Sequence, residues 1–200
     1  MPKTYNLNTV HPTDVILDDD VWRPRLDINR AVTIPFLFDM AGETGIIDNF
    51  ANAARAVRSG KIPTDTDIAG ILNSDAVLYK IVEAAAYVLD RTGDSDLTGR
   101  LDDLIARIAE AQEPDGYLLT RRTLAHLGAG NNDAPQRWSD LGHDLELYIG
   151  GHLYEAAVAH YTATGKRTLL DVAVKHADLV DRLFGSAARI DVGGHPEIEL

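Results

Sequence analysis

The chain has 200 residues, which is enough for one domain with a sizeable core and short for two. Apolar residues make up 45% and charged residues 25%, and no apolar run approaches the roughly 20 residues that span a bilayer. The formal net charge of -12 disfavours nucleic acid and anionic membrane surfaces as partners, whereas a neutral substrate is indifferent to it. The first residues lack the apolar region of a secretory signal, so a cytoplasmic location is the default expectation.

Residues 1–24 are expected to be extended or irregular, with a short β-prone run in VILDDDVW and with Pro24 at the boundary to the helical part. From residue 25 to residue 200, the 3.6-residue spacing of apolar positions predicts one mainly α-helical domain. The clearest buried stripe lies within 97–112, where Leu101, Leu104 and Ile108 share one helix face. The predicted helices cover 25–43, 47–57, 76–91, 97–112, 144–163 and 167–184, and another begins near Pro196.

Two segments resemble one another, EAAAYVLDRTG at 83–93 and EAAVAHYTATG at 155–165. Each has the features of a helix end closed by glycine, the residue that best tolerates the left-handed position after a helix. Chance similarity between Ala-rich helices is the alternative, but the Thr-Gly in register favours a true repeat. Because a repeated helix pair cannot bury its apolar face alone, neighbouring pairs are expected to stack into a solenoid or a closed toroid.

The segment 113–143 is far longer than the ~4–6 residues of an ordinary loop. Its aromatic and aliphatic residues require burial, so we expect an ordered excursion over one end of the helical array. Aromatic faces beside polar groups suit the alternating C–H and O–H surfaces of a sugar. The Pro-Asp-Gly turn within it has two interpretations, a tight turn for backbone reasons or a pair of sugar contacts, Asp115 and Tyr117.

Four histidines mark further positions. His143 and Glu146 are three residues apart at the start of a predicted helix, so both could face a cleft. His195 precedes Pro196, a favourable first helical residue, and this is either a plain helix start or a histidine at the mouth of the array beside 113–143. His152 and His176 are interpreted as structural or core histidines. No HExxH-type spacing occurs, so no metal ligand is assigned in this stretch.

Taken in order, these segments resemble the bacterial β-L-arabinofuranosidases of glycoside hydrolase family 127, formerly a domain of unknown function. The resemblance covers nearly the whole chain from Val21, and the order of its motifs is specific. The matching segments are Val32–Pro35, Ile47–Phe50, Tyr79–Lys80, Gln112–Leu118, Arg137–Trp138, Glu146–Tyr148, Gly151–Leu153, Glu155–Tyr161, Ala163–Lys166, Leu169–Ala173 and Gly194–Leu200.

The resemblance implies an (α/α)6 toroid of helical hairpins, the six-hairpin glycosidase fold, with a sugar-binding cleft and β-sandwich domains after it. It also implies retaining hydrolysis with a zinc-bound cysteine thiolate as nucleophile and a glutamate as acid/base. In the family those residues lie beyond GHPEIEL, and this chain has no cysteine. The 200 residues are therefore expected to be a fragment with about half of the toroid, no catalytic residue and no activity alone. Zinc is expected in the full-length family member.

Two departures from the family pattern concern the substrate. An aspartate of the family falls at Val77, although Ser74–Asp75 echo an earlier Ser-Asp, and the sugar-contacting histidine of the HELY motif falls at Leu145. A displacement of two residues rotates a helical side chain by about 200°, so His143 replaces that histidine only where the backbone is not yet helical. The resemblance implies a carbohydrate substrate and carries over His195 as a sugar contact. The further residues expected to bind the substrate are His143, Glu146, Asp115, Tyr117 and Asp75.

The sequence is consistent with three hypotheses. The first is a glycosidase acting on a β-L-arabinofuranoside or a related sugar, with its nucleophile and zinc site downstream of residue 200. The second is a non-catalytic relative that binds glycans or serves as a scaffold. The third is a stand-alone helical module whose open face meets a partner protein. Only the first predicts a downstream glutamate and a cysteine cluster.

Overall fold

The computed structural model describes residues 10–61, 68–71, 73–128, 136–184, 189–191 and 193–199. Within these ranges the regular structure is helical and no strand occurs. Residues 1–9 of the predicted N-terminal segment and 129–135 of the predicted excursion lie outside the described residues. No helix among the described residues is long and apolar enough to cross a membrane.

The β-prone run at 15–22 forms no strand, and its first residues are irregular as expected. Asp19 instead accepts hydrogen bonds from the backbone N–H groups of Val21 and Trp22, at 2.7 and 2.6 Å, and a helix begins there. Pro24 lies in the first turn of that helix, where its missing N–H has no intrahelical partner to lose. The helical part of the chain therefore starts at Trp22, three residues earlier than the predicted 25.

The predicted helices are present, with ends shifted by a few residues. The first is continuous through α1 (Trp22–Ile28), the π-helical turn η2 (Asn29–Thr33) and α2 (Ile34–Glu43). The other long helices are α3 (Ile46–Ser59), α4 (Ser74–Thr92), α5 (Ser95–Ala111), α7 (Glu146–Thr164) and α8 (Thr168–Phe184), and two 3-10 turns are η1 (Pro12–Asp14) and η3 (Pro196–Glu199). One helix, α6 (Thr120–Gly128), was not predicted and lies within the excursion.

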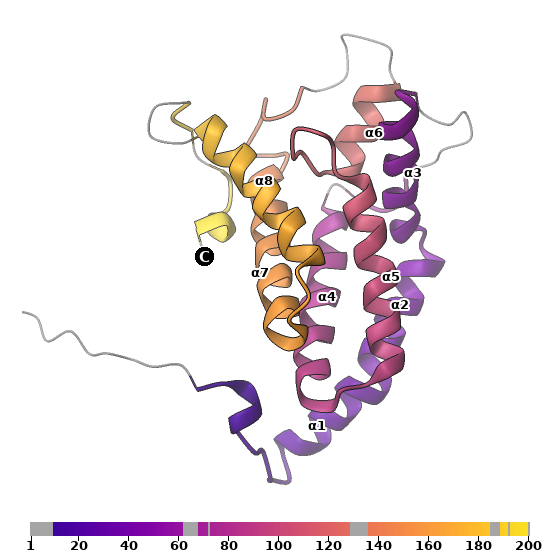
Figure 1. The fold of residues 1–200 in the computed structure, drawn as a ribbon, viewed down its shortest axis with the longest axis vertical. Helices are drawn as coiled ribbons and strands as arrows, with labels where there is room; N and C mark the ends of the chain where they lie inside the picture. Colours follow the sequence, from indigo (N-terminus) through magenta and orange to yellow (C-terminus); the bar gives the residue numbers. More distant parts are fainter. Residues whose placement is uncertain are drawn as a thin grey trace, which may run out of the picture.

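The helices form two layers that follow the sequence repeat. Figure 1 shows α4 and α7 side by side and running in the same direction, and these two helices make the most extensive contact in the fold. α2 contacts α4 and continues this inner layer, whereas in the other layer α5 contacts α3 on one side and α8 on the other. Both inner helices end at a left-handed glycine, Gly93 with φ 62° and Gly165 with φ 70°. The predicted repeat is confirmed, and the arrangement is that of part of an α/α toroid.

The core lies between the two layers. The predicted stripe of α5 is buried, and Phe50 of α3 packs edge-on against Tyr79 of α4, with ring centroids 6.2 Å apart. Apolar side chains also face solvent on the inner layer, where Tyr87 is 50% and Val158 is 56% exposed. An array of this kind leaves such a face open when no further helix pair covers it.

Two glycines of α7 allow close packing on its other side. A Cβ on Gly151 would lie 2.7 Å from the backbone carbonyl carbon of Glu197 in η3, and a Cβ on Gly150 would lie 2.8 Å from Cε1 of His176 in α8. Both distances are shorter than any real Cβ contact. The Gly-Gly pair therefore allows the backbone of η3 and the His176 ring of α8 to pack directly on the backbone of α7.

A buried aspartate connects α4 to the start of α6. The carboxylate of Asp75, in the first turn of α4, accepts hydrogen bonds of 2.7 Å from both the backbone N–H and the hydroxyl of Thr120. Asp75 is only 2% exposed, and this burial raises its pKa from 3.8 to about 6, against the opposing effect of the two hydrogen bonds from Thr120.

Replacing Gly151 tests the packing of η3. The substitution Gly151→Ala should lower the free energy of unfolding by about 1–3 kcal/mol, because the added methyl group must displace η3. Gly99→Ala in α5 is the matched control, since no atom lies within 4 Å of its Cβ position and alanine is the better helix former. Urea unfolding followed by circular dichroism measures both, and equal stability of the two variants would contradict the packing described.

The titration of Asp75 gives a second test. Since its folded pKa of about 6 exceeds the unfolded value of 3.8, the stability from its protonated form is present below about pH 4 and is lost as pH rises to about 6. The variant Asp75→Asn cannot titrate. The difference in unfolding free energy, wild type minus variant, should therefore fall by up to about 3 kcal/mol over this window. Parallel pH curves for the two proteins would contradict the assignment.

Candidate functional site

A buried carboxylate lies where the excursion meets the start of α7. Glu146 accepts a 2.5 Å hydrogen bond from the Tyr117 hydroxyl and a 2.7 Å hydrogen bond from the Trp138 backbone N–H. Glu146 is 3% and Tyr117 is 1% exposed, and burial raises the pKa of both groups. These two expected sugar-binding residues are therefore brought together, but they face one another inside the protein.

The Pro-Asp-Gly turn packs on the outer helix α8. Gly116 has φ 107°, and a Cβ there would lie 2.4 Å from the carbonyl oxygen of Lys175, so the turn requires glycine. Asp115 accepts a hydrogen bond from the backbone N–H of Tyr117 at 3.1 Å and pairs with Arg137 at 2.9 Å. Its side chain is still 49% exposed. The geometry accounts for the turn residues by backbone needs and leaves a carboxylate edge of Asp115 open to solvent.

His143 lies just before α7 and not on it. The helix begins at Glu146, and Leu145 before it has left-handed backbone angles, φ 57° and ψ 22°. His143 can replace the family histidine that aligns with Leu145 only where the backbone is not helical. The left-handed angles of Leu145 meet this condition. The His143 ring is 88% exposed and its Nδ1 lies 2.9 Å from a carboxylate oxygen of Asp140, whose hydrogen bond raises the histidine pKa.

His195 stands at the same end of the array, next to the excursion. The N–H of Gly194 donates to the carbonyl oxygen of Leu141 at 3.1 Å, which confirms the predicted position of this segment beside 113–143. His195 is exposed, and its ring packs against that of Tyr148 in the first turn of α7 with centroids 4.8 Å apart. Its Nδ1 accepts the backbone N–H of Glu197 at 3.1 Å, which fixes the ring orientation.

Tyr148 is the centre of this group of side chains. Its hydroxyl accepts a 2.5 Å hydrogen bond from Nζ of Lys80 in α4. Its ring also contacts His152 edge-on, with centroids 4.5 Å apart, on the next turn of α7. Through Tyr148, the exposed His195 is continuous with residues that lie deeper between α4, α7 and η3.

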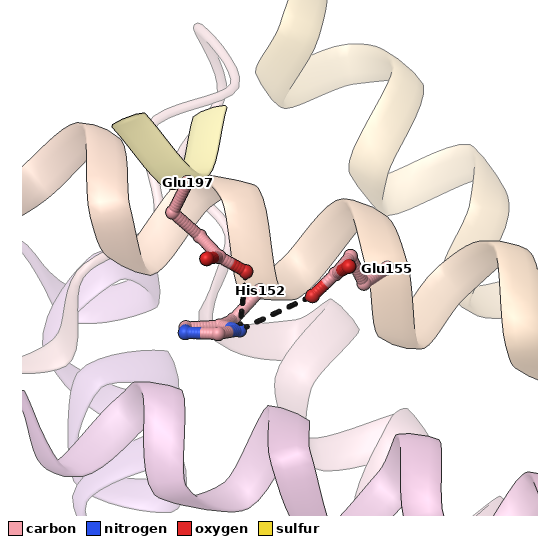
Figure 2. A group of neighbouring side chains, drawn as sticks. All are labelled: His152, Glu155 and Glu197. Atoms are coloured by element: carbon pink, nitrogen blue, oxygen red, sulfur yellow. Dashed lines mark ion pairs between the residues drawn. The ribbon is translucent and has the colours of Figure 1, made fainter. Parts of the chain in front are cut away.

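The deeper residues include a group that the sequence did not reveal. Figure 2 shows His152 and Glu155 of α7 with Glu197 of η3, the two carboxylates directed at the imidazole. His152 Nδ1 lies 2.8 Å from Glu197 Oε1 and 3.4 Å from Glu155 Oε2. His152 and Glu197 are 8% and 9% exposed. Burial lowers the pKa of His152, while the carboxyl of Glu197 raises the pKa of Glu155.

His152 and Glu155 are three residues apart, and this spacing is visible in the sequence. The approach of Glu197, 45 residues after His152, is not visible there, because it depends on the close packing of η3 at Gly151. His176, by contrast, is the predicted core histidine. It is 2% exposed, and its Nδ1 lies 2.8 Å from the Tyr154 hydroxyl.

Of the six expected sugar-binding residues, three are buried with their polar atoms engaged (Asp75, Tyr117 and Glu146) and three are exposed (Asp115, His143 and His195). Their roles in sugar binding stay predictions.

Comparison with known proteins places this geometry in a family. The chain is 35% identical over 202 aligned positions to a non-reducing end β-L-arabinofuranosidase of Bifidobacterium longum subsp. longum, covering 94% of this chain and 30% of that protein. A solved GH127 β-L-arabinofuranosidase from Geobacillus stearothermophilus T6 superposes with a TM-score of 0.80 at 34% identity, and a second solved GH127 β-arabinofuranosidase does so with 0.79 at 40% identity. Each superposition covers 92% of this chain.

The chain thus spans less than a third of the length of these relatives, 30% of the first and 28% of each solved structure. The family described as β-L-arabinofuranosidase, GH127 catalytic domain, matches residues 14–197. Because this match covers nearly all of its residues, the chain belongs to the GH127 β-L-arabinofuranosidase catalytic-domain family.

Proposed function

We propose that the chain is the N-terminal part of a glycoside hydrolase that acts on β-L-arabinofuranosides or a related sugar by a retaining mechanism. The observation that carries the proposal is the exposed His195 ring, held against Tyr148 beside the excursion in a chain of this family. An aromatic ring next to a fixed imidazole offers a sugar both an apolar face and a hydrogen-bonding group.

Within this proposal the six expected residues divide by their exposure. His195, His143 and Asp115 present polar atoms to solvent and are proposed to contact the sugar. Asp75, Tyr117 and Glu146 are proposed to position those contacts, because their hydrogen bonds hold the excursion to α4 and α7. Leucine at 145 and valine at 77 stand where the family pattern has polar residues, which is compatible with a divergent specificity or with a non-catalytic relative.

The thiolate zinc site that the family resemblance implies does not fit these residues. Such a site requires cysteine, and the chain contains none. The nucleophile, the acid/base and that zinc are therefore proposed to lie in sequence outside these 200 residues. The roles proposed for His195 and its neighbours are limited to binding and positioning the sugar, and they do not depend on that zinc.

A chimera tests the proposal. This chain would replace the matching 30% of the Bifidobacterium longum relative, and hydrolysis of an aryl β-L-arabinofuranoside would be measured with added zinc. The chimera should turn over the substrate, whereas the isolated chain should not. His195→Ala in the chimera should lower kcat/KM by roughly 10- to 100-fold, because a hydrogen bond to the sugar worth about 1–3 kcal/mol is lost.

His126→Ala is the matched control, since that histidine lies on α6 and has no role in the proposal. It should leave kcat/KM of the chimera unchanged. Turnover by the isolated chain would place the chemistry within these 200 residues and contradict the proposal. A folded chimera that binds arabinofuranosides without cleaving them would favour the non-catalytic hypothesis instead.

A further inference from the structure

The group formed by His152, Glu155 and Glu197 is a convergence of metal-ligating atoms that the proposed glycosidase activity does not use. One donor atom from each of the three residues lies within 4.8 Å of the others. Two donors come from successive turns of α7 and the third from η3, a segment more than 40 residues away in sequence. Close packing at Gly151 brings the two segments together.

The buried polar atoms of this group lack hydrogen-bond partners. Neither ring nitrogen of His152 nor Oε1 of Glu197 makes a hydrogen bond, although both residues are more than nine-tenths buried. The 2.8 Å approach of the imidazole and the carboxylate therefore brings the two atoms close without hydrogen-bond alignment. A buried polar atom left unpaired is destabilising, and a ligand bound by these atoms would offset that cost.

The charge of the surroundings favours a cation as that ligand. Glu155 and Glu197 face one another, and the charge of Glu155 adds to burial in raising the pKa of Glu83 in α4. The positive charge of Lys80 adds to burial in lowering the pKa of His152, but the Lys80 ammonium donates its hydrogen bond to the Tyr148 hydroxyl, at 2.5 Å. Two carboxylates thus converge on one imidazole nitrogen, a set of donors that divalent cations bind.

The donor set indicates the class of cation. One imidazole nitrogen with two carboxylate oxygens suits borderline first-row divalent ions such as Zn²⁺ better than all-oxygen Ca²⁺ sites or thiolate sites. Ligands about 2.1 Å from a tetrahedral ion lie about 3.4 Å from one another, and the two nitrogen–oxygen distances are 2.8 and 3.4 Å. The longer distance already fits, and the shorter one must widen by about 0.6 Å.

The group is also accessible. It borders a groove of about 530 Å³ lined by Glu83, Tyr87, Glu155, Val158, Glu197 and Ile198, among others. Glu155, with 35% of its side chain exposed, stands on the groove side. An ion could enter from the groove and complete its coordination with water there.

We propose that His152 Nδ1, Glu155 and Glu197 form a binding site for a first-row divalent cation of the Zn²⁺ class. The ion cross-links η3 to α7 and thereby fixes His195, two residues before Glu197. This site differs from the thiolate zinc site of the family resemblance, because all its ligands come from a chain without cysteine. The inference does not depend on the glycosidase proposal, since it concerns binding by these 200 residues alone.

The test is Zn²⁺ binding by the tag-free 200-residue chain, measured by calorimetry and by competition with a chromophoric chelator. One equivalent should bind, and the long-range ¹⁵N signals of the His152 ring should shift as Nδ1 becomes metal-bound. Glu197→Gln keeps the size of the side chain but removes a carboxylate ligand, so its affinity should be at least roughly tenfold weaker. Glu199→Gln, on the exposed side of the same turn, is the matched control and should bind like wild type.

Thermal unfolding with and without Zn²⁺ guards against loss of the fold in a variant. Zn²⁺ should raise the Tm of the wild type and of Glu199→Gln but not that of Glu197→Gln or of Glu155→Gln. Glu155 is partly exposed, so its substitution should leave the fold intact while removing a ligand. Absence of binding by the wild type, or equal binding by Glu197→Gln and Glu199→Gln, would overturn the proposal. Neither result would bear on turnover by the chimera.

Discussion

The buried carboxylate of Glu146 is the interaction on which the functional end of the molecule depends. It accepts the Tyr117 hydroxyl from one part of the excursion and the Trp138 N–H from another, at the point where α7 begins. Burying a carboxylate is costly unless hydrogen bonds replace its hydration, so the two donors must stay in place. Together with Asp75, which accepts two hydrogen bonds from Thr120, this carboxylate holds the excursion against α4 and α7.

The second constraint is the pair of glycines, Gly150 and Gly151, about one turn after Glu146 in α7. Because Gly150 and Gly151 lack side chains, the His176 ring of α8 and the backbone of η3 can contact the helix backbone directly. This contact carries His195 to Tyr148 and Glu197 to His152. The same packing thus supports both the carbohydrate site proposed at the exposed end and the cation site proposed below it.

Local patterns in the sequence were sufficient for the helices and for the repeat. The stripe of α5 and the closing glycines Gly93 and Gly165 each act within a few residues, so spacing alone predicts them. The candidate site depends on long-range contacts that spacing does not contain. Nothing local indicates that Asp75 meets Thr120, or that Glu197 reaches His152, and the left-handed Leu145 is unexpected for a residue with a Cβ. α6 is short and lies between turn-rich stretches, which hides its periodicity.

Tyr148 lies between two histidines and couples them. Its ring meets His152 at 4.5 Å and His195 at 4.8 Å, both edge-on, so whatever orders one imidazole also restrains the other. Thermodynamic linkage makes such an effect mutual: an ion that tightens the hold on a saccharide must itself be held more tightly when the saccharide is present, by the same factor. Under the two proposals, the Tyr148 ring would link the cation site to the carbohydrate site, so that binding at one strengthens binding at the other.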